Sequence, residues 1–512
     1  MKKLYLLSLC YLCFAPLSAQ SNNISEGAES ITIAELRDHM FYLASDELQG
    51  RQTGTAGYNK AVQYAATQLR QAGLIPLCKN NNSLSYYQYF TIAKYSPDHN
   101  NSITIAKDSG RQTYAFEDNF IITFGGPFEI KELSGGLAFV GGGVRESEYG
   151  IDDYKNVDVN DKWVVMYENL PVTIREKLPK EILKKYLLSP ENKKLAVQHA
   201  KDAGAVGIIF IPNDNHFKNW NIAMEDHRDF YTIPKTGQLF INMELPSVLI
   251  DSSIIEYLFA GQKYNPLEDK KSYKSFELKN CELTLNKQYT LSNIQTANAI
   301  GMIEGSDPIL KKEYITLCAH LDHMGIWHSE IMNGADDNAS GSVGVLEIAE
   351  ALSFSKSERS IICMLFSGEE LPILGSYYFT ENSLVPLNTI IANINLDMIG
   401  FSDTDIKALA PIGAGRITPK LKEVVSEVSE RKQYVPIDWA YADTSRYVNM
   451  SDHYPFHLKK IPAVFFFSGD NADIHMPSDD PEKIDYHFFQ KSCQFVYEIV
   501  MELANRNVSL RD

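Results

Sequence analysis

The chain has 512 residues, of which 44% are hydrophobic and 22% are charged, and this ordinary globular composition argues against a disordered or fibrous protein. Its formal net charge of −17 argues against nucleic acid as a partner, because a phosphate backbone requires a basic binding surface. The length predicts two or three domains.

The first 19 residues have the pattern of a secretory signal peptide. Lys2 and Lys3 precede a short apolar run, Leu4–Pro16, and the small residue Ala19 suits cleavage. The run is too short to cross a bilayer, and no later segment is long and apolar enough to do so. We therefore expect export, to the periplasm or the medium, with cleavage near Ala19 and no membrane span. Two cysteines in this segment leave a lipid anchor open as an alternative.

Two helices and then a region of short strands are predicted next. Leu36, Met40 and Leu43 fall on one helical face, and a second helix runs from about residue 58 to 72 before a glycine. From residue 114 to 287 short apolar strands such as VGIIFIP dominate, with one helix before that strand. This pattern of strands and a helix predicts a smaller α/β domain inserted into the chain.

From residue 295 onward, strands and helices alternate. The predicted helices are 342–352, 374–381, 420–430 and about 488–505. The predicted strands are near-continuous apolar runs: ANAIGMIEG, YITLCAHL, SIICMLFS, TIIANINLDMIG and IPAVFFFSG. Such runs are typical of strands with helices on both faces. The sequence therefore predicts an α/β fold in which 20–113 and 288–512 form a mostly parallel or mixed central sheet covered on both faces, interrupted by the insert.

Acids and histidines follow these predicted strands or lie in the loops beyond them: His320, Asp337, Glu369, Glu370, Asp397 and His475. Because ligands of such sheets bind beyond the carboxyl ends of the strands, we expect these side chains to converge there. Taken singly, each residue has an ordinary alternative as a solvated strand end or a helix cap. Together, two imidazoles and several carboxylates suit two divalent ions, and the imidazoles favour zinc.

Asp322 lies two residues after His320, so that strand periodicity would place both side chains on the same side. A carboxylate there can accept the Nδ1–H of the histidine and leave Nε2 for a metal. We therefore predict that Asp322 holds His320, and that nearby Asp479 orients His475. One glutamate must stay outside the metal coordination to accept a proton from the attacking water.

The motifs HLD (320–322), GADDNASG (334–341), EE (369–370), LDM (396–398) and IHMPSDD (474–480), in this order, resemble the pattern of the M28 family of zinc aminopeptidases. The N-terminal segment FYLASDELQGRQTGTAGYNKAVQYAATQLRQAGL is similar to the family's opening helices. Residues 114–287 resemble the protease-associated domain that some members carry as an insert. The resemblance covers most of the chain after the signal peptide.

The resemblance implies a role for each matching residue. Asp337 would bridge two zinc ions. His320 and Asp397 would complete one coordination set, and Glu370 and His475 the other. Glu369 would be the general base, and Asp322 would hold His320. Met476 departs from the family pattern, which more usually has a small hydroxyl residue there. The remaining histidines of these segments match no family role and are expected to line the pocket or to be solvated: His323, His328 and His453.

The expected function is that of an exported exopeptidase with two zinc ions, an aminopeptidase that removes N-terminal residues from peptides by attack of a hydroxide that bridges the metals. A carboxypeptidase or dipeptidase with the same metals is one alternative, and Arg416 or Arg446 could then bind the substrate carboxylate. A glutaminyl cyclase with one zinc ion is another. A binding module on an inactive scaffold is a third, which the complete set of expected ligands argues against.

Overall fold

The computed structural model describes most of the chain, which forms two compact units. The units are Met1–Phe90 with Gln295–Asp512, and Thr91–Ile294. The predicted signal peptide lies outside the described residues. The predicted insert, 114–287, falls within the second unit, and its resemblance to a protease-associated domain stays a prediction. The described residues are 27–80, 83–124, 128–183, 186, 190–220, 229–234, 245–262, 264–267, 273–444, 447–506 and 510.

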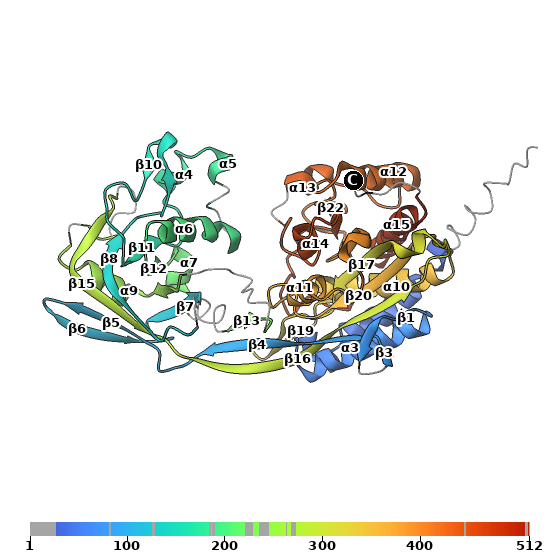
Figure 1. Cartoon of the computed structure of the whole chain (residues 1–512), viewed down its shortest axis with the longest axis horizontal. Coiled ribbons are helices and arrows are strands. Elements are labelled where there is room, and N and C mark those ends of the chain that lie inside the picture. Colours follow the sequence, from blue (N-terminus) through green and yellow to red (C-terminus); the bar gives the residue numbers. More distant parts are fainter. Residues whose placement is uncertain are drawn as a thin grey trace, which may run out of the picture. The chain divides into compact units, whose positions relative to one another are not determined.

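A mixed sheet organises the first unit (Figure 1). Its strands include, in spatial order, β16 (Tyr289–Ile303), β20 (Ser360–Phe366), β17 (Tyr314–His320), β21 (Ile390–Leu396), β23 (Ala463–Phe467) and β22 (Ala410–Ile412), and β1 (Ile75–Pro76) also pairs with β16. The four strands β20, β17, β21 and β23 pair in parallel, whereas β16 and β22 pair antiparallel with their neighbours. The predicted α/β fold with a mixed, largely parallel sheet is therefore confirmed. The short edge strand β22 was not predicted.

Helices cover both faces of this sheet. The helices are α2 (Ile33–Leu43), α3 (Ala56–Gln71), α10 (Gly341–Ser353), α11 (Leu374–Glu381), α12 (Pro419–Lys432), α13 (Trp439–Thr444), α14 (Tyr454–Leu458) and α15 (Tyr486–Asn505). The last of them begins two residues before its predicted start because the Asp485 side chain accepts hydrogen bonds from the N–H groups of His487 and Phe488. Among the described residues, no helix combines the length and the apolar character that crossing a bilayer requires.

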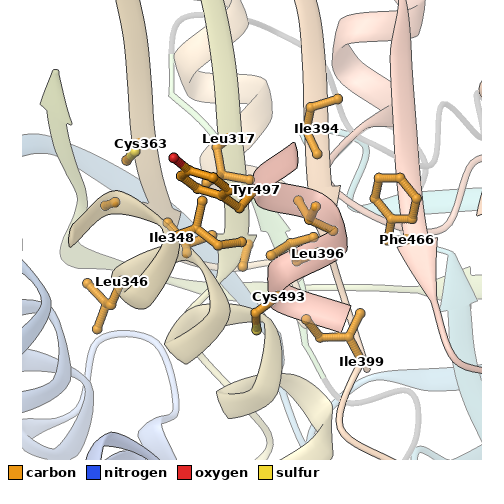
Figure 2. Close-up of a cluster of buried hydrophobic side chains, with 14 of the residues drawn as sticks. Leu317, Leu346, Ile348, Cys363, Ile394, Leu396, Ile399, Phe466, Cys493 and Tyr497 are labelled. Carbon is orange, nitrogen blue, oxygen red and sulfur yellow. The ribbon is translucent and has the colours of Figure 1, made fainter. Parts of the chain in front are cut away.

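The central strands divide their side chains between two hydrophobic cores, as the period of two in a strand requires. Leu317 of β17 packs into a core with α10 and α15, to which Ile348 and Cys493 belong (Figure 2). The next residue, Cys318, packs into a core on the opposite face together with Phe379 of α11. Burial on both faces explains why these strands are apolar throughout their length.

The second unit has its own sheet and its own core, in which Phe139 and Trp163 are fully buried. The strands β8, β11, β12 and β14 pair in parallel, and the others pair antiparallel. In spatial order the strands are β6 (Gly110–Ala115), β5 (Ser102–Lys107), β15 (Phe276–Asn286), β8 (Glu132–Phe139), β11 (Lys162–Tyr167), β12 (Gly207–Ile211), β14 (Ser247–Ile250) and β7 (Phe120–Phe124).

We expect Leu317→Ala to lower the free energy of unfolding by about 2–5 kcal/mol, because this fully buried side chain would leave a cavity between sheet and helices. Ile309→Ala is the matched control, since Ile309 is 77% exposed, and we expect it to change the free energy by less than about 0.5 kcal/mol. Urea unfolding measures both. Equal midpoints for the two variants would contradict the packing described for β17.

Candidate metal centre

The parallel strands bring their carboxyl ends to one edge of the sheet, and the predicted site residues meet there. His320 is the last residue of β17 and lies opposite Phe366, the last residue of the adjacent β20. Beyond β20 the chain turns at Gly368, whose φ of +77° favours glycine, and continues into Glu369 and Glu370. Asp397 directly follows β21, the neighbour of β17 on its other side.

His320 is the centre of the first group of side chains. Its Nε2 atom lies 3.3 Å from Oδ1 of Asp397 and 3.5 Å from Oδ1 of Asp337. Oε2 of Glu369 lies 3.9 Å from the same nitrogen. The imidazole is buried, with 1% of its side chain exposed, so these carboxylates surround it in place of water. Three of the predicted residues from three segments therefore face one nitrogen atom.

A second group forms around the other oxygen of Asp337. Nε2 of His475 lies 3.0 Å from Oδ2 of Asp337 and 3.4 Å from Oε2 of Glu370. Asp337 thus directs Oδ1 toward His320 and Oδ2 toward His475. A carboxylate between two groups of donors is the arrangement that a bridging ligand requires.

His323 belongs to this second group, although the sequence predicted no role for it. Its Nδ1 atom lies 2.9 Å from Oε1 of Glu370 and 3.8 Å from Oδ2 of Asp337, and the ring is buried. The available signal was its position three residues after His320, directly after a strand end. That signal is weak, because the contact with Glu370 depends on the path of the chain beyond β17.

Side chains next to the predicted ligands fix the main chain that carries them. The Asp479 carboxylate accepts hydrogen bonds from the N–H groups of Asp336 and Asp337, at 2.8 and 3.0 Å. We predicted that Asp479 orients His475; instead it holds the loop of Asp337. The Asp479 N–H closes a turn by donating to the carbonyl oxygen of Met476.

Asn338 connects the Asp337 loop to the end of β21. Its Nδ2 donates to the carbonyl oxygen of Leu396 at 2.9 Å, and its Oδ1 accepts from the N–H of Met398 at 3.2 Å. These two residues flank Asp397, whose Oδ2 accepts a hydrogen bond from the hydroxyl of Ser451 at 2.7 Å. The relative positions of the two predicted carboxylate ligands are therefore set by hydrogen bonds to main chain and hydroxyl groups.

Asp322 differs from the prediction. Nδ1 of His320 lies 3.1 Å from the main-chain carbonyl oxygen of Asp322, not from its carboxylate. The carboxylate instead accepts the N–H of Glu369 at 3.2 Å. The prediction assumed that the strand continues through Asp322, but β17 ends at His320 and the alternation of side chains ends with it. Asp322 therefore holds the predicted general base, and its carbonyl contacts the imidazole.

Arg51 is a further residue of the site that the sequence did not reveal. Its guanidinium is buried and donates hydrogen bonds to the carbonyl oxygens of Leu321 at 3.0 Å, Asn333 at 2.6 Å and Gly334 at 2.9 Å. It thereby joins the segment after β17 to the segment before Asp337. Since its partners are distant in sequence, only the folded chain identifies it.

The pKa values in the cluster are displaced in the directions expected of closely paired charges. Burial opposes the charged form of His475, but hydrogen bonds to Asp337 and Glu370 outweigh it and raise its pKa to about 11. Burial would raise the pKa of Glu370, but its contacts with imidazoles lower that pKa well below the usual range. Burial raises the pKa of Glu369 well above its usual range. Glu369 is thus the carboxyl group of this site best suited to hold a proton.

The donor types fit zinc. Each group combines an imidazole nitrogen with carboxylate oxygens, which are ordinary zinc ligands. Among the described residues, no lysine or arginine forms an ion pair with these four carboxylates: Asp337, Glu369, Glu370 and Asp397. Buried acids that lack such partners require a cation nearby. The residues present therefore fit a pair of metal ions.

The other candidate residues lie apart from these two groups. His328 is exposed at the turn between two short strands, and Met476 is 49% exposed. His453 is buried, and its Nε2 lies 2.8 Å from the carbonyl oxygen of Val448. Arg416 is exposed, and Arg446 lies outside the described residues.

Two proteins that are similar to this chain in sequence are named as aminopeptidases. The aminopeptidase YwaD of Bacillus subtilis is 27% identical over 236 residues, which are 44% of this chain and 49% of that protein. A probable leucine aminopeptidase of Arthroderma otae is 26% identical over 185 residues, 34% of this chain and 49% of that protein. The chain thus spans about half the length of the curated relatives it matches.

Two solved structures share the fold. An aminopeptidase from Aneurinibacillus sp. strain AM-1 superposes with a TM-score of 0.58 at 18% identity, over 95% of this chain and 97% of that one. BSAP, a zinc aminopeptidase from Bacillus subtilis, superposes with a TM-score of 0.51 at 19% identity, over 93% and 96%. At these identities the likeness concerns the fold.

The model of peptidase family M28 matches residues 298–500. That range contains β17, β20, β21 and β23 together with every predicted metal ligand. The family resemblance predicted from the strand-end motifs is thus confirmed, and residues 298–500 match peptidase family M28.

Proposed function

We propose that this protein is a metallo-aminopeptidase that uses two zinc ions to remove N-terminal residues from peptides. One observation carries the proposal: Asp337 lies between two groups of donors, with Oδ1 near His320 and Oδ2 near His475. The curated relatives are named as aminopeptidases, which supports the same reaction. A solved structure with this fold is titled a zinc aminopeptidase, which supports the choice of metal.

The protein residues have separable roles in such a reaction. Asp397 and His320 would hold one ion, Glu370 and His475 the other, with Asp337 shared between them. Zinc at these positions supplies Lewis acidity that polarises a peptide carbonyl and makes water more acidic. The protein residues move the proton and position the group that carries it.

Glu369 is the residue that would carry this proton. Its carboxylate lies beside the first group of donors, with Oε2 3.9 Å from Nε2 of His320, and 12% of the side chain is exposed. Its N–H donates to the carboxylate of Asp322, which fixes the start of the Glu369–Glu370 segment. Burial raises the pKa of Glu369, so the group can accept a proton from the attacking water and later donate it to the leaving amine.

Three alternatives to the aminopeptidase make different demands on the site. A carboxypeptidase or dipeptidase needs a cation for the substrate carboxylate, and Arg416, the described candidate for that role, is exposed. A cyclase with one zinc ion would leave the second group of donors unused. An inactive binding module would have no need of Glu369 beside the metal ligands. The donor geometry therefore favours the aminopeptidase.

We also propose that the protein is exported, because residues 1–19 have the charge and apolar pattern of a signal peptide. Expression of the full chain in a Gram-negative host, followed by N-terminal sequencing of the protein in the periplasm and medium, tests this. We expect a new N-terminus at about Gln20. Retention of Met1 on protein that stays in the cytoplasm would contradict export.

Metal removal and return should control both stability and activity. Metal-free protein is expected to bind about two zinc ions per chain, since zinc exopeptidase sites of this type hold a pair. Each site adds about 2.7 kcal/mol of stability when free zinc exceeds its Kd by about 100-fold. Elemental analysis and thermal unfolding measure the two quantities. A stoichiometry near one would favour the cyclase, and none would contradict the proposed function.

A substrate panel separates the exopeptidase alternatives. We expect hydrolysis of aminoacyl anilides with a free α-amino group and little hydrolysis of their N-acetyl counterparts. N-acetylated peptides with a free C-terminus serve as carboxypeptidase substrates, and dipeptides as dipeptidase substrates. Release of amino acids from the C-terminus of N-acetylated peptides would replace the aminopeptidase assignment.

Glu369→Gln is expected to keep the zinc content and to lose roughly 10²- to 10⁴-fold in kcat, because the amide cannot carry a proton. Glu423→Gln is the matched control, since Glu423 is an exposed residue of α12 far from the motifs. Its kcat should equal that of the wild type. Near-normal turnover in Glu369→Gln would remove this residue from the reaction.

A further inference from the structure

His323, which the sequence expected only to line the pocket or to be solvated, contacts Glu370, a metal-ligand candidate whose two oxygens face two different imidazoles. Nδ1 of His323 lies 2.9 Å from Oε1 of Glu370, and Nε2 of His475 lies 3.4 Å from Oε2 of the same carboxylate. The two imidazoles thus divide the two oxygens of Glu370 between them. A carboxylate held in this way offers one oxygen to a metal and keeps the other in a hydrogen bond.

From this geometry we infer that His323 is a positioning residue, which donates its Nδ1–H to Oε1 of Glu370 and leaves Oε2 as the metal ligand beside His475. This inference rests on the proposed function and names the residue that orients one ligand of the second zinc ion. Partners that hydrogen-bond to metal ligands fix the ligand orientation and strengthen metal binding.

The alternative is that His323 itself ligates the metal through Nδ1. That would require Nε2 to carry the ring proton, because a neutral imidazole that binds metal through one nitrogen is protonated on the other. Nε2 of His323 is buried and has no hydrogen-bond partner among the described residues. A buried N–H without an acceptor costs about 1–3 kcal/mol, and orphaned donors are rarer than orphaned acceptors. If Nδ1 is the donor, Nε2 carries no proton, and no buried N–H is left without an acceptor.

Packing holds the ring in this position. A Cβ atom at Gly334 would come within 2.4 Å of Cδ2 of His323, so the glycine lets the imidazole lie directly against the main chain. Gly334 has a φ of +58°, and its carbonyl oxygen accepts a hydrogen bond from Arg51. The ring of His475 meets the ring of His323 edge to face, with centroids 5.7 Å apart. His323 is therefore fixed from the side of the main chain and presents one nitrogen to Glu370.

The test compares His323→Leu, which removes the donor, with His323→Asn, whose Nδ2–H₂ can occupy the place of Nδ1. Metal-free proteins are titrated with zinc against a chromophoric chelator to obtain two successive Kd values, and thermal unfolding without zinc reports the fold. His487→Leu is the matched control, because His487 is exposed on α15.

In His323→Leu we expect one of the two zinc ions to bind about 10- to 100-fold more weakly, while the other keeps its affinity. His323→Asn should recover most of this loss, and His487→Leu should match the wild type. X-ray absorption of the zinc-loaded wild type should give about one imidazole per zinc ion, from His320 and His475.

Three results would overturn the inference. The first is unchanged zinc affinity in His323→Leu. The second combines two findings. His323→Asn does not recover the affinity, and the wild type has an average near 1.5 imidazoles per zinc ion, which shows that His323 is a ligand. The third is that His323→Leu lowers the thermal stability of the zinc-free protein and weakens zinc binding equally at both sites. That result would indicate a merely structural role. Failure of the proposed function is seen separately, as a wild type that does not bind two zinc ions.

Discussion

The burial of several carboxylates at one edge of a sheet is the constraint on which the rest of this structure depends. Asp337, Glu369, Glu370 and Asp397 lose most of their contact with water, and imidazoles are their ion-pair partners among the described residues. Such a group of like charges is costly unless positive charge is close by. The charges gather because the parallel strands bring their carboxyl ends to the same edge, and we propose that a pair of metal ions compensates them.

The surrounding residues hold this cluster mainly through the main chain. Arg51 donates to carbonyl oxygens on either side of the site, and Asp479 accepts N–H groups of the Asp337 loop. Asn338 joins the same loop to the residues that flank Asp397. Because these contacts fix the backbone and leave most ligand atoms free, the donors keep their positions without losing their capacity to bind a cation.

Three histidines that are close in sequence have separate places in the fold. His320 ends β17 and faces the first group of donors, His323 lies beneath Glu370 in the second, and His328 is exposed at a turn. Their separation follows from the path of the chain, in which β17 ends at His320 and a hairpin of β18 (Gly325–Trp327) and β19 (Glu330–Met332) follows. A cluster of histidines in a sequence is therefore evidence for a site, but it does not assign the role of each member.

The sequence by itself determined the α/β fold, the main helices and strands of the second half, and the family resemblance. Apolar periodicity and acids at strand ends are local patterns, which can be recognised without knowing the paths of the loops. The sequence also named the six side chains that the structure brings together. Only the tertiary structure decided the edge strand β22, the partners of Asp322 and Asp479, and the places of Arg51 and His323. These depend on how the chain turns after each strand and on which distant loop it then meets, and no periodicity records such contacts.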